Sequence, residues 1–258
     1  MEGKRVSRLV YRNVAAAYGR KTILHDINCA FPPGKVTVII GPNGCGKTTL
    51  LRCALGAYGS TVKRTAGEIT LNNQPLHTLS TRRRASVVTY IPQRPLVAAP
   101  FTVRAVVEMG RFALNRDDSA VEYALRKVGL TDLADIPFGE LSVGQQQRVT
   151  LARSLAQVAG KESEAVFLAD EPTSAMDVYH EISALNLFRD MAARGAAVVV
   201  VMHDLVRASR WADRAVILQQ GRLFRDGDAP DIFDPTILGE VFGVSYPTGN
   251  FAEPTISG

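Results

Sequence analysis

Residues 36–55 place the tightest constraint on how this chain folds. Residues 36–40 are β-branched throughout, which is typical of a buried strand. A glycine-rich loop follows them, and Lys47–Leu55 is rich in helix-forming residues. A strand, a short loop and a helix in this order, repeated later in the chain by other strands and helices, predict an α/β core with a parallel sheet.

The loop at residues 41–48 fits the pattern G-x-x-x-x-G-K-[ST], which binds nucleotide phosphates. Its glycines let backbone N–H groups turn toward one point, where the helix N-terminus adds partial positive charge. Lys47 supplies a formal charge for the β- and γ-phosphates, and the Thr48 hydroxyl is suited to ligate Mg²⁺. A purely structural turn would leave these two residues unexplained. The predicted phosphate-binding residues are Gly41, Pro42, Asn43, Gly44, Cys45, Gly46, Lys47, Thr48 and Thr49.

Residues 166–171 combine an apolar strand with two acids at its carboxyl end. Asp170 is suited to hold Mg²⁺ there, usually through water. Glu171 is suited to orient or deprotonate an attacking water, and a general base of this kind contributes about 10²–10⁴-fold in rate. The alternative is a pair of acids that caps the next helix. Beside a phosphate-binding loop, the catalytic interpretation is favoured.

The composition is that of a globular protein without a disulfide framework. The chain has 258 residues, of which 46% are hydrophobic and 21% charged, and a net charge of +5. This length predicts one large domain or two small ones. Its three cysteines indicate a reducing compartment. The longest apolar runs, 36–40 and 196–202, are far shorter than the ~20 residues of a membrane span, so we expect a soluble chain. The mild positive charge favours a solvated basic surface over a nucleic-acid partner.

Apolar patterns and turn residues predict further elements on either side of a helical stretch. Helix caps are expected at Thr102, at Asp117 or Asp118, and at Ser142. Strands are expected at 8–14, 23–31, 67–71, 87–91, 165–169 and 196–202, a hairpin at 216–225, and helices at 103–112, 117–128, 143–158 and 178–194.

Residues 141–145 read Leu-Ser-Val-Gly-Gln. This segment is similar to the L-S-G-G-Q signature of the ATP-binding-cassette ATPases, with Val143 in place of the first glycine. In that family the residues matched by Ser142 and Gly144 touch the γ-phosphate of ATP held by the facing subunit, and Gln145 completes the motif. A helix N-terminus capped by Ser142 is also suited to face an anion. The resemblance covers residues 8–245.

Other positions of the family pattern follow in order along the chain. The resemblance implies that Tyr18 stacks on adenine, with a half-buried turn aromatic as the alternative. It implies that Gln93 senses Mg²⁺ and links to the helical stretch, and that the loop 174–177, ending at Asp177, crosses a dimer interface. It also implies that His203 contacts the γ-phosphate, whereas a lone histidine in this place is more often a turn residue. The implied metal ligands are Thr48, Gln93 and Asp170, and the implied catalytic residues are Glu171 and His203.

The resemblance also implies an architecture and cofactors. The expected fold class is α/β, with a P-loop NTPase core whose sheet is mixed but mainly parallel, an N-terminal antiparallel β subdomain and an inserted helical subdomain. The chain 1–258 is then a single ATPase domain, in which 1–98 and 159–258 form the core with the β subdomain. Residues 99–158 form the helical insert that carries the signature. The implied cofactors are ATP and Mg²⁺.

One cassette without a fused membrane span resembles the separate ATPase subunits of bacterial importers. The runs 101–111, 202–205, 212–214 and 240–244 are similar to the ATPases that import iron chelates, haem and vitamin B12. The resemblance implies a homodimer that sandwiches two ATP molecules, an integral membrane permease and, through that permease, a periplasmic or lipoprotein substrate-binding protein. It places the chain peripherally on the cytoplasmic face of the inner membrane, where it energises uptake of haem or a ferric siderophore.

Three alternatives to this function remain open at this point. One is the ATPase of a cobalamin or metal-ion importer. Another is a soluble cassette ATPase that acts on nucleic acid or ribosomes, although such proteins usually carry two cassettes or long coiled-coil inserts. The third is a non-catalytic nucleotide-switched scaffold, against which the presence of both Glu171 and His203 argues.

Three further features carry hypotheses of their own. Leu96, Val97 and Phe101 are candidates for contact with a permease helix, with ordinary packing of the insert as the alternative. Cys45 lies in the glycine-rich loop beside a helix N-terminus and Lys47. These would lower its thiol pKa and make it reactive, with a small tolerated side chain as the alternative. The arginines at 82–84 are expected to form a solvated helix face rather than a site for lipid or nucleic acid.

Overall fold

The computed structural model describes residues 8–56, 62–95, 97, 100–245 and 255–256. Its centre is a six-stranded sheet in the order β10-β9-β3-β8-β7-β6. The strands from β9 to β6 run parallel to their neighbours, and β10 pairs with β9 as an antiparallel hairpin. The strands are β3 (Lys35–Ile40), β6 (Val88–Ile91), β7 (Val166–Asp170), β8 (Ala197–Val201), β9 (Arg214–Gln219) and β10 (Arg222–Asp228).

A second, antiparallel sheet in the order β2-β1-β4-β5 is built mainly from the N-terminal strands. Helix α1 (Lys47–Leu55) packs between the two sheets, because Leu50 shares one buried cluster with Phe31 of this sheet and Val199 of the central one. The Tyr11 hydroxyl also donates to the Leu50 carbonyl over 2.8 Å. The helix that follows the glycine-rich loop is therefore held on both sides. The strands are β1 (Leu9–Tyr18), β2 (Lys21–Phe31), β4 (Val62–Leu71) and β5 (Gln74–Pro75).

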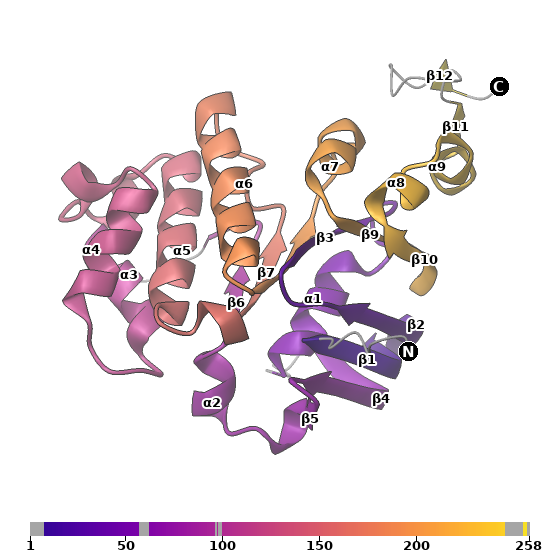
Figure 1. Ribbon diagram of the computed structural model, residues 1–258, viewed down its shortest axis with the longest axis horizontal. Coiled ribbons are helices and arrows are strands. Elements are labelled where there is room, and N and C mark those ends of the chain that lie inside the picture. The colour runs from indigo at the N-terminus through magenta and orange to yellow at the C-terminus, as the bar shows by residue number, and fades with distance from the viewer. Residues whose placement is uncertain (1–7, 57–61, 96, 98–99, 246–254, 257–258) are drawn as a thin grey trace.

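Between β6 and β7 the chain forms helices that gather at one end of the molecule, away from the antiparallel sheet (Figure 1). These are α3 (Val103–Glu108), α4 (Asp118–Lys127) and α5 (Val143–Val158). Thr102, Asp117 and Ser142 cap them, each accepting a hydrogen bond from a backbone N–H three residues on. The predicted caps are confirmed, and of the two acids at 117–118 it is Asp117 that caps α4.

The remaining elements pack around the central sheet. Helix α6 (Val178–Ala193) lies against β3 and β8. In the described part of the chain, none of the helices is both long enough and apolar enough to cross a bilayer. The others are α2 (Thr81–Ala85), α7 (Leu205–Trp211), α8 (Ala229–Ile232), α9 (Pro235–Phe242), the strands β11 (Val244–Ser245) and β12 (Thr255–Ile256), and the 3-10 turns Leu76–Thr78, Met109–Arg111, Thr131–Leu133, Phe138–Glu140 and Glu162–Glu164.

The structure confirms the predicted α/β architecture and differs in the length of several elements. The strand expected at 8–14 runs to Tyr18, because β-bulges with Asn13 at φ +50° interrupt its alternation without ending its pairing. The strand expected at 67–71 begins at Val62. The helix expected at 103–112 ends at Glu108 and continues as a 3-10 turn. The short helices α2 and α7 were not expected, since such helices depend on packing rather than on a periodic pattern.

The contact of α6 with the sheet can be tested at Phe188. Its fully buried ring packs edge-on against Phe167 and Trp211, with centroids 6.4 and 6.3 Å away. We expect Phe188→Ala to lower the free energy of unfolding by about 3–5 kcal/mol, because it removes apolar contacts and leaves a cavity. Urea denaturation followed by circular dichroism measures the change. Phe112→Ala, at a ring that is 96% exposed, is the control and should change stability little. A small effect of both substitutions would contradict this account of the core.

Candidate functional site

The candidate site lies at the carboxyl ends of the central parallel strands. Val201 of β8 pairs with Ile39 of β3 on one side and with Asp170 of β7 on the other. The residues that follow these three positions therefore emerge at one level of the sheet edge. This register brings together the glycine-rich loop after β3, Glu171 after β7 and His203 after β8.

The glycine-rich loop ends in a helix start that no side chain caps. Gly46 is the N-cap residue of α1 and has φ +109°. A Cβ there would lie 2.6 Å from Leu24 Cδ2, so a larger residue would be both strained and crowded. The first N–H groups of α1 are thus open to an anion rather than to a capping side chain.

Lys47 is held inside the curve of this loop. Its Nζ donates to the carbonyl oxygens of Gly41, at 2.7 Å, and Pro42, at 3.0 Å. The side chain is buried, so its charge is concentrated on the loop rather than spread into solvent. An ammonium carries three N–H donors, and two of them hold the loop carbonyls. The loop therefore curves around the positive charge that phosphate oxygens would meet.

Asp170 and Thr48 bring two oxygen ligands together. Asp170 is buried at the end of β7, and its carboxylate accepts hydrogen bonds from the Thr48 hydroxyl and, at 3.4 Å, from the Tyr90 hydroxyl. Burial raises the pKa of Asp170 above its ordinary value, and the Thr48 bond opposes this shift. A buried carboxylate beside a hydroxyl fits a hard cation such as Mg²⁺.

The Asp170 carboxylate and the Thr48 hydroxyl suit a metal ion that takes most of its ligands from water and from substrate phosphates. Within the described ranges, no group of three or more His, Cys, Asp and Glu side chains is placed to hold a metal ion. Mg²⁺ usually keeps several waters and shares one or two carboxylates with substrate phosphates, which matches a single carboxylate and a hydroxyl.

Glu171 is the centre of a hydrogen-bonded group of three residues. Its Oε2 accepts a bond from Gln93 Nε2 at 2.8 Å, and its Oε1 lies 2.5 Å from His203 Nε2. Its backbone is in the left-handed region, with φ +47°, which costs about 1–3 kcal/mol for a residue other than glycine. Both carboxylate oxygens are therefore oriented, as a base that positions a water requires.

The signature segment stands at the exposed start of α5. The Ser142 hydroxyl accepts from Gln145 N at 3.3 Å, and Gln145 Oε1 accepts from Ser142 N at 2.8 Å, which makes a capping box. Val143 is 56% exposed beside them. A Cβ on Gly144 would lie 2.6 Å from the Ala175 carbonyl oxygen, so glycine is needed for this close approach. The first turn of α5 thus faces outward while its backbone rests on the loop after Glu171.

Two further predicted residues lie apart from the Glu171 group. The Tyr18 hydroxyl, at the end of β1, accepts from Arg52 of α1 at 3.3 Å. Asp177 caps α6 by accepting from His180 N at 2.9 Å. In one chain the structure brings together Gln93, Glu171 and His203, and separately Thr48 and Asp170. Tyr18, Asp177 and the capping box of α5 contact other partners.

Gln147 is a residue of this region that sequence reasoning missed. Its buried side-chain amide contacts the loop at Gln93 and the loop at Ser174 and Ala175. The sequence does contain a signal for it: Gln147 is a polar residue four positions before Leu151, so both lie on the same, buried face of α5. A polar side chain on a buried helix face needs hydrogen-bond partners.

Two hypotheses about surface and thiol chemistry have clear outcomes. Of the two interpretations of Cys45, the structure favours a small side chain over a reactive thiol, because burial raises the pKa of this thiol and outweighs the nearby charge of Lys47. Of the arginines at 82–84, Arg82 and Arg83 are exposed, as a solvated helix face predicts, whereas Arg84 is partly buried. Arg83 pairs with Glu164 at 2.5 Å, and Arg82 Nε donates to the Ala113 carbonyl at 3.1 Å.

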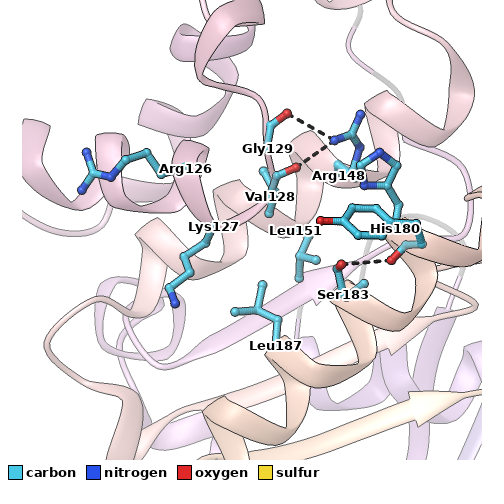
Figure 2. Close-up of a pocket in the computed structure, with 11 residues that line it drawn as sticks. Arg126, Lys127, Val128, Gly129, Arg148, Leu151, His180, Ser183 and Leu187 are labelled. Carbon is cyan, nitrogen blue, oxygen red and sulfur yellow. Dashed lines mark hydrogen bonds between the residues drawn. The ribbon is translucent and has the colours of Figure 1, made fainter.

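A separate cavity of about 160 Å³ lies where α4 and α5 meet α6 (Figure 2). Arg148 donates there to the carbonyls of Val128 and Gly129, at 2.9 and 3.3 Å, and so closes the end of α4. Tyr179 and His180 line its other side. The cavity lacks the glycine-rich loop and the Glu171 group among its lining residues.

Comparisons with known proteins agree with this arrangement. The family model described as ABC transporter matches residues 24–174. The chain is 38% identical to the hemin import ATP-binding protein HmuV of Chelativorans sp. over 92% of each chain. It is 34% identical to the iron(3+)-hydroxamate import ATP-binding protein FhuC of Bacillus subtilis, covering 93% of this chain and 89% of that one. Among solved structures, an inward-facing putative metal-chelate type ABC transporter superposes with a TM-score of 0.74 at 25% identity, covering 93% of this chain and 90% of that one.

Replacing Glu171 by Gln tests its role as the base. We expect Glu171→Gln to lower ATP turnover by at least about 10²-fold while ATP still binds, because the amide keeps the shape but cannot accept the water proton. Steady-state phosphate release and fluorescent-nucleotide binding measure the two effects. Glu164→Gln, in an exposed ion pair away from this edge, is the control and should turn over normally. Normal turnover by Glu171→Gln would remove it from this role.

The raised pKa of Asp170 gives a prediction for stability. Between the ordinary aspartate pKa of about 4 and the raised value, the folded state binds more protons than the unfolded state, so this residue's contribution becomes less favourable as the pH rises. We expect Asp170→Asn to raise the free energy of unfolding near neutral pH, with little gain below about pH 4. Urea denaturation without nucleotide at the two pH values measures this. A destabilised variant at neutral pH would show that burial of the carboxylate is not penalised.

Proposed function

This chain belongs to the ABC transporter family, and we propose that it is the ATP-hydrolysing subunit of an importer for an iron chelate, haem or a ferric siderophore. The observation that carries the catalytic part is the Glu171 carboxylate, oriented on both oxygens by Gln93 and His203 next to the phosphate loop. The cargo follows from the relatives, whose names specify import of hemin and of iron(3+)-hydroxamate. Cobalamin or metal-ion import is the alternative.

In the proposed reaction, the loop 41–46 and Lys47 bind the phosphates of ATP. Thr48, Asp170 and Gln93 would hold Mg²⁺, and the ion when bound would neutralise charge on the phosphates. Glu171 orients a water for attack on the γ-phosphate and takes up its proton at one carboxylate oxygen, while the bond between the γ-phosphorus and the bridging oxygen breaks and ADP leaves. Gln93 and His203 keep that carboxylate in place, and His203 is half-exposed beside it for contact with the γ-phosphate.

We also propose that two copies act together, head to tail, around two ATP molecules. Ser142 and Gln145 stand at the outward-facing start of α5 and bond to each other rather than to the Glu171 group of the same chain, so we assign their phosphate contacts to ATP on a second copy. The exposed apolar residues Val143, Val178 and Ile182 support burial of this surface in a dimer. Tyr18 stacks on the adenine in the same chain in this proposal, and the loop ending at Asp177 lies at the dimer interface.

The helical segment is proposed as the part that meets a separate permease at the cytoplasmic face of the membrane. We propose the division into a core, 1–98 and 159–258, and an insert, 99–158. Phe101 is 41% exposed at the start of this insert, where its carbonyl accepts a hydrogen bond from Phe138 N at 2.8 Å. Val97 is half-buried against the core cluster, and Leu96 lies outside the described residues. A substrate-binding protein would act through the permease.

A nucleic-acid function receives less support from the same surface. Arg83 is paired with Glu164, and Arg82 donates to a backbone carbonyl, so both are already engaged within the chain. Import therefore stays the favoured function.

Phe101 tests the proposed contact with the permease. We expect Phe101→Asp to leave basal ATP hydrolysis near normal and to abolish uptake of labelled haem or ferric siderophore in cells, because a charge would stand in an apolar contact. Phe101→Leu, which keeps an apolar side chain, is the control and should retain uptake. Normal uptake by Phe101→Asp would exclude this residue from the contact.

The function as a whole is tested by trapping. Glu171→Gln protein is loaded with ATP in its native cells, extracted in detergent and analysed by mass spectrometry of what co-purifies. A multispan permease with a substrate-binding protein is the expected result, and bound haem or siderophore would identify the cargo. Recovery of ribosomes or DNA-bound proteins without a membrane protein would overturn the transport proposal.

A further inference from the structure

Gln147 joins the parts of the chain that surround Glu171. Its side chain is 1% exposed, and its amide makes three hydrogen bonds outside its own helix. Nε2 donates to the Gln93 carbonyl at 3.3 Å and to Ser174 Oγ at 3.2 Å, and Oε1 accepts from Ala175 N at 3.1 Å. A buried amide with its donors and its acceptor engaged holds its partners firmly, because each bond lost would leave a polar group unsatisfied.

The first partner controls one oxygen of the Glu171 carboxylate. Gln93 donates from its own side chain to Glu171 Oε2 at 2.8 Å. Gln147 holds the main-chain carbonyl of the same residue. The backbone from which Gln93 reaches Glu171 is therefore tied to α5.

The other two partners belong to the loop that follows Glu171 directly. Ser174 N donates to the Glu171 carbonyl at 3.3 Å, which closes a turn. Gln147 holds this turn at the Ser174 hydroxyl and at Ala175 N, and Gly144, one helical turn earlier, lies against the Ala175 carbonyl. The loop is thus clamped by one face of the first two turns of α5.

Glu171 needs such support because of its backbone. Its φ of +47° is unfavourable for a residue with a side chain and persists only when the surroundings hold it. A loop free to relax would turn the carboxylate away from the position set by Gln93 and His203.

We propose that Gln147 is a positioning residue for ATP hydrolysis, which holds the Gln93 loop and the loop 174–175 against α5 so that the Glu171 carboxylate keeps its orientation. The same helix begins with the signature segment 142–145. A shift of that end of α5 therefore moves Gln147 and the two loops that position Glu171 in the same chain. Contact of the signature segment with the second copy would then change the rate of hydrolysis through Gln147. This inference rests on the proposed role of Glu171 as the base.

Gln147→Met is the test, because methionine keeps the length of the side chain and removes its hydrogen bonds. We expect kcat to fall by about 10²-fold, as for a small misplacement of a catalytic group, with KM for ATP close to that of the unsubstituted chain. The matched control is Gln157→Met on the same helix, which removes two bonds from Gln157 Nε2 to the carbonyls of Ala85 and Val88, at 2.7 and 2.9 Å, away from the site. Both variants should lose similar stability in urea, and only Gln147→Met should lose kcat.

A double-mutant cycle separates positioning from a general loss of structure. In the Glu171→Gln background the base is absent, so adding Gln147→Met should lower residual single-turnover hydrolysis no further. If Gln147→Met does not fold, Gln147→Glu, which keeps the acceptor and loses both donors, takes its place in the same cycle.

The outcomes distinguish the inference from the function on which it rests. A full further loss of rate in the Glu171→Gln background, or a kcat of Gln147→Met equal to that of Gln157→Met, would overturn the role of Gln147. Absence of ATP hydrolysis by the unsubstituted chain, or normal turnover by Glu171→Gln, would instead overturn the proposed function.

Discussion

The register of three parallel strands holds the site together. Because Val201 pairs with both Ile39 and Asp170, the loops after β3, β7 and β8 begin at the same level of the sheet. Every residue of β7 and β8 is buried, and successive side chains pack into the two apolar clusters on opposite faces of the sheet, so a slip of one strand would disrupt close packing on both faces. The energy of the core therefore sets the relative positions of the phosphate loop, Glu171 and His203.

The polar groups at this edge are stable only as a network. Asp170 is buried with a raised pKa and two hydroxyl donors, and Glu171 has an unfavourable backbone conformation. Hydrogen bonds from Gln93 and contact with His203 orient Glu171, and Gln147 ties the adjoining loops to α5. The site keeps strain and a buried carboxylate that the core alone would not favour, which is typical of functional sites.

Prediction from the sequence succeeded for features that residues close together along the chain determine. A helix start after a glycine-rich loop, capping residues such as Ser142 and unalternating apolar strands are all set by neighbouring residues, and the structure has them in place. It left alternatives open where burial decides. The thiol of Cys45 lies near a positive charge along the chain, but its desolvation raises its pKa, and no local pattern reports how deeply a side chain is covered. The predicted strand at 8–14 is shorter than β1, because β-bulges interrupt the alternation of apolar and polar residues from which its length was predicted.

The sequence by itself determined the strand, glycine-rich loop and helix at residues 36–55, the acidic end of β7 and the family to which the chain is related, because these depend on residue types at fixed spacing. Only the tertiary structure decided that Gln93, Glu171 and His203 meet, and that Gln147 contacts two loops, since the residues involved are up to 110 positions apart along the chain. The physical reason is that these hydrogen bonds join segments far apart along the chain, and the register of the buried strands sets where those segments lie.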